Sequence, residues 1–191
     1  GSQYSYDPFT LAAFTRALQI SPSLTITDWR GDFQRAQVSN LVARIYTQTT
    51  EQRRLLSAAV WPRYAQGRDE YFQDSKAWLS AGAIDAIAPM LYSTDLIADL
   101  NNWTAAAQDF QSSAGGRWVL PGIGVKSTAC VSFDQIAARI HTARSIGAAG
   151  HALFSYAALR DCADGSGTSY LDLLRAGPYA QPAVLPPVTW K

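Results

Sequence analysis

Residues 55–92 read LLSAAVWPRYAQGRDEYFQDSKAWLSAGAIDAIAPMLY, and this stretch decides the fold. It begins with an apolar run over 55–61 that has the length of a buried strand, followed by a polar loop over 62–70. Asp74 is placed to cap a helix that ends at Gly82. Residues 83–92 are apolar enough for a strand covered on both faces, as in parallel sheets. The stretch therefore predicts one β-loop-α-β unit.

Parallel sheets bind ligands beyond the carboxyl ends of their strands. Residues 151–156 form a further apolar run that predicts a strand of the same kind. The residues that follow or end these strands are therefore the candidates for substrate binding: Trp61, Arg63, Tyr64, Tyr92 and Tyr156.

The remaining chain repeats this pattern. Asp7-Pro8 begins a helix that Ser21-Pro22 ends, and Thr27-Asp28 opens a second helical region with an apolar stripe over 38–46. Further strands are predicted at 118–125 and 151–156, with glycines in the first that indicate close backbone approach. Four strands at intervals of about thirty residues predict four βα units with parallel strands, an α/β fold that is half of a (β/α)8 TIM-type barrel. Residues 1–177 form this domain, and residues 178–191 are a Pro-rich tail.

Composition excludes several classes of function. The chain has 191 residues and a formal net charge of +1, so no nucleic-acid partner is expected. No apolar run approaches the ~20 residues that a membrane span needs. A phosphate-binding glycine motif is missing, and His141 and His151 are not spaced as metal ligands, so neither a cofactor nor a metal is expected. Gly1-Ser2 has the look of a cloning remnant.

The two cysteines and two further side chains have structural interpretations. Cys130 and Cys162 each follow a predicted strand and should lie on the same face. A disulfide between them, which would suggest export, and a pair of free thiols are both compatible with the sequence. Asp85 begins its strand, away from the ligand end, and is expected to be structural. Trp78 and Trp103 lie on helix faces and are expected in the core.

Several motifs resemble one known family. They are Tyr4-Ser5-Tyr6-Asp7-Pro8-Phe9, Asp28-Trp29-Arg30, SAAVWP at 57–62, QDSKAWL at 73–79, DAIAPMLY at 85–92 and LPGIG at 120–124. Together they resemble the bacterial glycoside-hydrolase-like family of (β/α)8 barrels, also described as family-10-like glycosyl hydrolases. The resemblance covers nearly the whole chain but only the carboxyl half of that barrel. The family's Asp-Tyr-x-Arg-Tyr-Pro-like segment is expected upstream of Tyr4.

The resemblance implies a carbohydrate-active parent protein that is secreted, periplasmic or in the cell envelope. Glycoside hydrolysis uses two carboxyl groups, about 5–9.5 Å apart. Asp74 is the carboxylate in the family motif, although a helix N-cap is the alternative role. Trp61, Tyr92 and Tyr156 are expected to stack on sugar rings or to pack at the barrel mouth. With its partner carboxylate expected in the missing half, the chain alone should be inactive or very weak.

Two other functions remain open from the sequence. One is a non-catalytic half-barrel module that assembles into a homodimer or higher oligomer, or with the missing amino-terminal half, and at most binds carbohydrate. An open half-barrel favours it because unpaired sheet edges and an apolar inner face need a partner. The other is an open flavodoxin-like sheet, which would require a cofactor loop that the sequence lacks.

Overall fold

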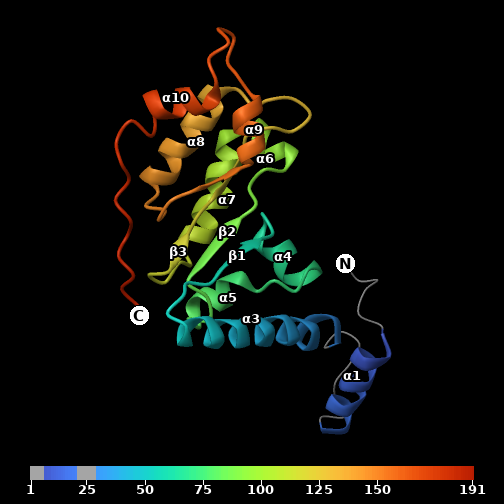
Figure 1. Cartoon of the computed structure of the whole chain (residues 1–191). Helices are drawn as coiled ribbons and strands as arrows, with labels where there is room; N and C mark the ends of the chain where they lie inside the picture. The colour runs from blue at the N-terminus through green and yellow to red at the C-terminus, as the bar shows by residue number, and fades with distance from the viewer. Residues whose placement is uncertain (1–6, 21–28) are drawn as a thin grey trace.

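The computed structural model describes residues 7–20 and 29–191, with side chains for 7–20 and 31–191. In chain order (Figure 1) the elements are α1 (Pro8–Ile20), the π-helical turn η1 (Trp29–Phe33), α3 (Gln34–Glu51), β1 (Ser57–Val60), α4 (Tyr64–Glu70), α5 (Ser75–Ser80), β2 (Ala86–Pro89), α6 (Thr94–Ala98), α7 (Leu100–Gln111), β3 (Trp118–Val119), β4 (Gly122–Gly124), α8 (Phe133–Ser145), β5 (Ala152–Phe154), α9 (Tyr156–Asp161) and α10 (Tyr170–Ala176).

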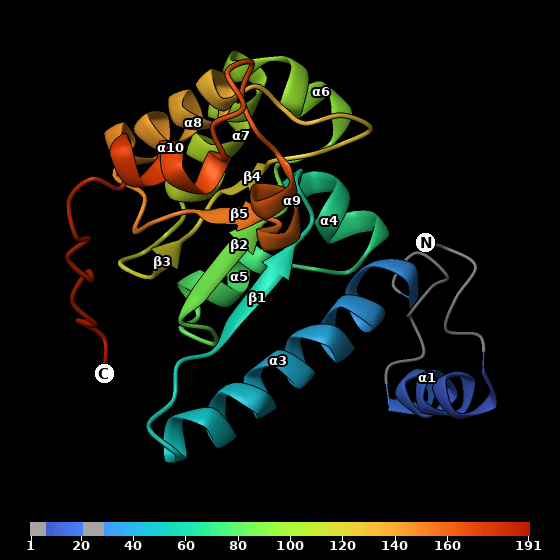
Figure 2. The same ribbon diagram turned by 45° about the horizontal axis from the view of Figure 1, so that its top comes forward.

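The strands form two small parallel sheets, β1-β2-β3 and β4-β5. Residues 118–125, predicted as one strand, are divided at Leu120-Pro121 into β3 and β4. Before the division, the Leu120 amide donates to Ile87 O at 2.9 Å, and after it the Ala152 amide donates to Pro121 O at 3.1 Å. The segment thus passes from β2 to β5, and the two sheets lie next to each other (Figure 2). The α/β class with parallel strands is confirmed, and the described residues do not close into a barrel.

Helices cover one face of the strands, and the hydrophobic core lies between them. The strands contribute side chains of at most 1% exposure, namely Val60, Ile87, Val119 and Ile123. The helices contribute fully buried large side chains, namely Leu79, Trp103, Phe110, Ile136 and Ile140. Trp78 is also buried, so the prediction that Trp78 and Trp103 are core residues is confirmed.

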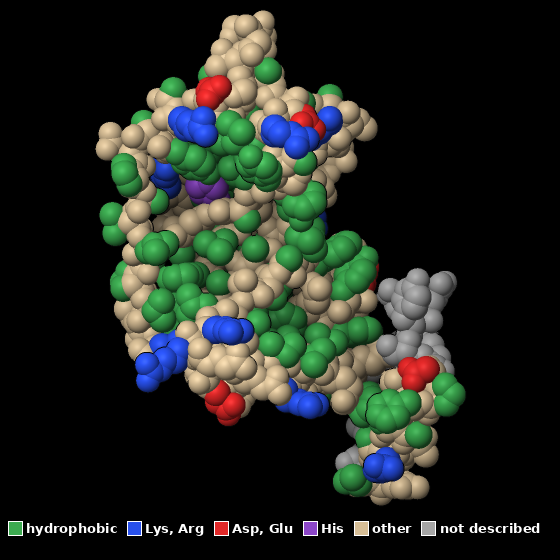
Figure 3. Space-filling model, in the orientation of Figure 1, with side chains coloured by type: hydrophobic (Ala, Val, Ile, Leu, Met, Phe, Trp, Pro, Cys, Tyr) green, Lys and Arg blue, Asp and Glu red, His purple; other side chains and the backbone are tan. Residues whose placement is uncertain are grey.

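The opposite face of the strands is exposed at the outer strands β1 and β5, whereas Ala86 of β2 and the two glycines of β4 are buried. Along β1, Val60 is buried while Ser57 and Ala59 are exposed, as expected when successive side chains point to opposite faces. The parallel register places Ala59 beside Ala88 of β2, and Phe154 of β5 is 55% exposed. Figure 3 shows hydrophobic side chains gathered over the hollowed middle of the molecule. At β1 and β5 this face therefore has no helix packed against it like those on the opposite face.

Asp85 links the amino end of β2 to the end of the chain. Its carboxylate is fully buried and accepts hydrogen bonds from the Leu56 amide at 2.7 Å and from Trp190 Nε1 at 2.7 Å. Lys191 Nζ lies 3.1 Å from the same carboxylate. The tail after α10 runs along the side of the molecule to this point (Figure 1). Asp85 therefore has the structural role expected from its position.

Two short helices were not predicted. Residues 64–70 form α4, which no side chain caps, and Gly67 in its middle lies against Trp61. Packing, rather than helix propensity, therefore explains this short helix. Residues 156–161 form α9, whose cap Ser155 accepts from the Ala158 amide, so Tyr156 begins a helix instead of ending a strand.

The amino-terminal helices are only partly as expected. Of the apolar stripe on α3, Val38 and Val42 pack against the core, but Leu41 and Ile45 are exposed. The predicted helix end at Ser21-Pro22 and the helix start at Thr27-Asp28 lie outside the described residues, as does the segment before Asp7. None of the described helices has the length and hydropathy that a membrane crossing requires.

Candidate functional site

The candidate site lies at the carboxyl ends of the parallel strands. Trp61 follows β1, Tyr92 lies three residues after β2, and Ser155 follows β5. Ordinary α/β proteins place their ligands at this end, because the loops that follow the strands converge there. The structure separates the predicted residues into three places. Trp61, Arg63 and Tyr64, called here the Trp61 group, follow β1. Tyr92 belongs to an aromatic pair, and Tyr156 lies apart from both at the start of α9.

Trp61 is held by contacts on several sides. Its amide donates to Gln73 Oε1 and its indole nitrogen donates to Gln66 Oε1, each at 2.8 Å. The ring stacks on Tyr71 with centroids 4.0 Å apart. A Cβ added at Gly67 would lie 2.9 Å from the Trp61 Cβ, so α4 approaches closely only because this residue is glycine. Trp61 is thus rigid and half-buried.

Asp74 is bound to Tyr64 and does not cap α5. The Tyr64 hydroxyl donates to Asp74 Oδ1 at 2.6 Å, and Arg68 Nε lies 3.9 Å from Oδ2. Asp74 stands at the N-cap position of α5, but its side chain accepts no hydrogen bond from the first turn of that helix, so the predicted capping role is wrong. Burial, and then the hydrogen bond and charge of Asp74, raise the pKa of Tyr64 to about 12. Tyr64 therefore remains a hydroxyl donor, and Asp74 is bound by two side chains of α4.

Arg63, in the loop after β1, forms an ion pair with Asp95 in the first turn of α6, which follows β2. The Ser93 hydroxyl also donates to Asp95, at 2.7 Å. The Ser93 hydrogen bond, followed by the Arg63 interaction, holds the pKa of Asp95 below its ordinary value. Both charged side chains are about half exposed, so polar groups of a ligand could reach them.

Tyr92 and Phe154 form an aromatic pair across the ends of β2 and β5. Their rings are nearly parallel, with an interplanar angle of 7° and centroids 4.7 Å apart. Gly124 makes room for the pair, since a Cβ there would lie 2.8 Å from the Tyr92 Cβ. The predicted close backbone approach at the glycines is confirmed. Burial raises the pKa of Tyr92, while Phe154 keeps an exposed ring surface.

Sequence reasoning missed Phe154. Alternation along residues 151–156 indicates only that Ala152 and Phe154 share one face of the strand. The register with Gly122 and Gly124 of β4 then brings Phe154 to Tyr92. Tyr156, which was predicted instead, is 70% exposed at the start of α9. No ring contact joins it to Tyr92 or to Trp61 within the part of the chain that the structure describes.

Cys130 and Cys162 form a disulfide, with Cα atoms 6.0 Å apart. It joins the loop after β4 to Cys162, the residue that follows α9. Cys162 is buried, whereas Cys130 is exposed.

The site offers little for acid–base or metal chemistry. Among residues 7–20 and 31–191, every carboxyl whose pKa clearly departs from its ordinary value departs downward: Asp7, Asp85, Asp95, Asp161 and Asp164. A general acid needs a raised pKa. In the same ranges no cluster of three or more His, Cys, Asp or Glu side chains could hold a metal.

Comparison of the chain with protein-family models, with curated proteins and with solved structures finds no match.

Proposed function

We propose that the chain is the carbohydrate-binding half of a glycoside-hydrolase-like (β/α)8 barrel and is incomplete for catalysis alone. Its strands are parallel and neighbours in sequence pair in space, as in consecutive units of such a barrel. Helices separate β1 from β2, β2 from β3 and β4 from β5, while β3 and β4 are the two parts of one predicted strand. The proposed family rests on the resemblance of the sequence motifs, and the geometry of the described residues is compatible with it.

The stacked Tyr92–Phe154 pair carries the proposal. Sugar rings present C–H faces that pack on aromatic rings, while their hydroxyls need polar partners. Phe154 supplies an exposed aromatic surface beyond the strands. Arg63 and Asp95 supply donors and acceptors on the neighbouring loops. An apolar platform with a few polar groups at its border is typical of small-ligand sites.

Catalysis by the chain alone is not expected, because glycoside hydrolysis requires a proton donor and a second carboxylate across the scissile bond. Asp74 is engaged by Tyr64 and Arg68 on the side of α4. Asp95 is paired with Arg63, and its pKa is lowered. The disulfide supports the proposal that the parent protein acts outside the bacterial cytoplasm, since disulfides persist in oxidising compartments.

A non-catalytic, self-assembling half-barrel module is the second candidate. The open sheet face and the outer edges of β1 and β5 favour it, because each of these strands has a paired neighbour on one side only among the described elements. Unpaired edges and open apolar faces are commonly covered by another chain. The cover would be a second copy or the amino-terminal half of the barrel.

Calorimetric titration with a panel of oligosaccharides tests the first candidate. At least one is expected to bind in the millimolar range, about 4 kcal/mol of binding free energy. Phe154→Ala should weaken this binding at least fivefold, because the exposed stacking surface is lost. Phe9→Ala, which removes an exposed phenylalanine of α1, is the matched control and should have no effect. Equal affinity of wild type and Phe154→Ala would reject this site.

A further inference from the structure

A cavity lies at the other end of the strands, beneath the C-terminal tail. Its volume is about 1010 Å³, at the upper end of the range typical of small-molecule sites. One wall consists of Trp118 at the start of β3, the last turns of α8 and residues 148–151. The other wall consists of tail residues 177–186. It shares no lining residue with the aromatic pair or with the Trp61 group.

The tail spans this cavity without filling it. At one end, Arg144 donates to Pro178 O at 2.6 Å, and His151 is hydrogen-bonded to the Tyr179 hydroxyl. At the other end, Trp190 is bonded to Asp85. Between these attachments Val184 is 92% exposed. The tail is therefore held at both ends, and its middle leaves the space beneath it open.

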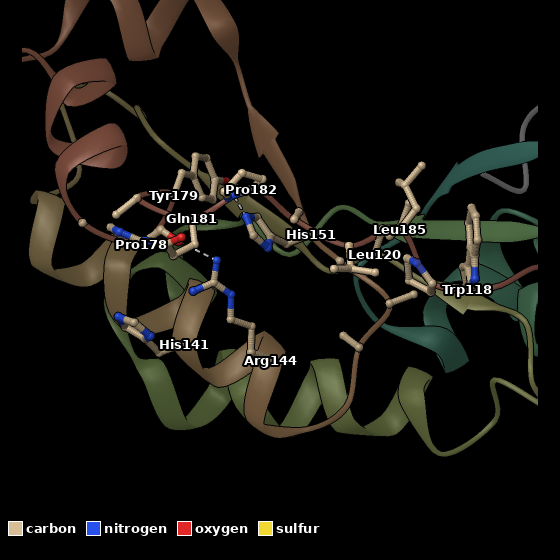
Figure 4. A pocket seen from close by; sticks show the side chains of 18 residues that line it. Trp118, Leu120, His141, Arg144, His151, Pro178, Tyr179, Gln181, Pro182 and Leu185 are labelled. Carbon is tan, nitrogen blue, oxygen red and sulfur yellow. Dashed lines mark hydrogen bonds between the residues drawn. The ribbon is translucent and has the colours of Figure 1, made fainter.

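The two ends of the cavity differ in chemistry (Figure 4). His141 and Arg144 lie at one end, near Pro178, whereas Trp118 and Leu120 lie at the other. The lining contains no Asp or Glu. Arg144 is always charged, and Pro178 O is its one hydrogen-bond acceptor among the described residues, so further N–H donors remain for a ligand. The cavity is thus cationic at one end and apolar at the other.

His151 does not add to this positive charge at neutral pH. Burial, and then the nearby charge of Arg144, lower the pKa of His151 to about 4. A neutral imidazole has one nitrogen that can accept from the Tyr179 hydroxyl, and His151 Nε2 lies within hydrogen-bond distance of that hydroxyl. The fixed charge of the cavity therefore comes from Arg144.

We propose that this cavity binds an amphipathic carboxylic acid, with its carboxylate on Arg144 and its apolar body along Trp118 and Leu120. Guanidinium and carboxylate match in geometry and form strong charge-assisted hydrogen bonds. The apolar body would cover ring and aliphatic surface that the tail leaves bare. This site is separate from the proposed carbohydrate site, so either one can fail without the other.

Calorimetric titration of the whole chain with decanoate, decan-1-ol and decylamine, below their micelle concentrations, tests the proposal. Decanoate should bind with one-to-one stoichiometry and about tenfold or more tighter than the alcohol or the amine. Arg144→Gln should remove this preference, whereas Arg175→Gln, on exposed α10, should retain it. Ala149→Trp, which fills the cavity and keeps Arg144, should abolish binding of all three ligands.

The comparison among the three ligands uses the wild-type protein, so it does not depend on how any variant folds. Decanoate binding no tighter than decan-1-ol would overturn the proposal. Unchanged decanoate affinity in Arg144→Gln or in Ala149→Trp, with an unaltered circular dichroism spectrum, would overturn it as well.

Discussion

The indole nitrogen of Trp190 donates a 2.7 Å hydrogen bond to Asp85, a residue 105 positions earlier in the chain. Burial alone raises the pKa of Asp85, but hydrogen bonds from Leu56, Trp190 and Lys191 outweigh it and hold that pKa below its ordinary value. The ionised carboxylate thus fastens the end of the tail to the amino ends of β1 and β2.

Asp85→Asn should lower the free energy of unfolding by about 2–4 kcal/mol, because buried donors lose a charged acceptor. Trp190→Phe, which removes one N–H, should cost about 1 kcal/mol. Urea unfolding measures both. Glu51→Gln is the control, since this carboxylate at the end of α3 is exposed and makes no hydrogen bond or ion pair with the described residues, so the change should matter by less than about 0.5 kcal/mol. An Asp85→Asn protein as stable as wild type would contradict the role assigned to Asp85.

The pKa of His151 makes stability depend on pH. Between the ordinary value of 6.5 and the native value of about 4, the unfolded chain binds a proton that the native chain does not. Stability should therefore fall by about 1–3 kcal/mol as the pH is lowered through this window. Asp85, whose native pKa is lowered, contributes its own loss only below about pH 4. His151→Gln should flatten the urea-unfolding profile between pH 6.5 and 4, and an unchanged slope would show that another group titrates.

Reduction of the Cys130–Cys162 disulfide should destabilise the protein. The bond closes a loop of 32 residues, for which the chain-entropy model gives about 3–4 kcal/mol. Urea unfolding of the oxidised protein and of the Cys130→Ser/Cys162→Ser double variant measures the difference. Thiol titration of the unreduced, denatured protein should find no free thiol, whereas two thiols would contradict the bond.

The open sheet face should lead to assembly. Light scattering at micromolar concentration is expected to give at least the mass of a dimer. Ala59→Glu places a charge on the exposed face of β1 and should shift the protein to monomer, whereas Thr47→Glu on exposed α3 should not. A wild-type protein that stays monomeric at all concentrations would contradict this expectation.

Much of the fold could be predicted because local signals act over few residues. The apolar runs around Val60 and Ile87 marked strands that are buried against helices. Asp7-Pro8 marked the start of α1, where the Asp7 carboxylate accepts from the Thr10 amide at 3.0 Å. Strand length and spacing then favoured a parallel α/β sheet. Each of these signals depends on periodicity or capping, which the sequence displays directly.

The remainder depends on contacts between distant segments. Helix α4 has no cap, and it forms where Gly67 meets Trp61. Asp74 has the position of a helix cap, but its carboxylate accepts a hydrogen bond from Tyr64, ten residues earlier in the chain. Phe154 became a site candidate only when the register of β4 and β5 placed it near Tyr92. No local pattern contains such pairings.

The most direct test of the carbohydrate-binding half-barrel is an NMR titration of the isotope-labelled chain with the oligosaccharide that binds best. The amide signals around Tyr92 and Phe154 should shift most, and the anomeric signals of the sugar should stay unchanged over days. Shifts confined to other surfaces, or no shifts at all, would contradict the binding site. New anomeric signals that grow with time and disappear in Asp74→Asn would show that the chain is a complete enzyme.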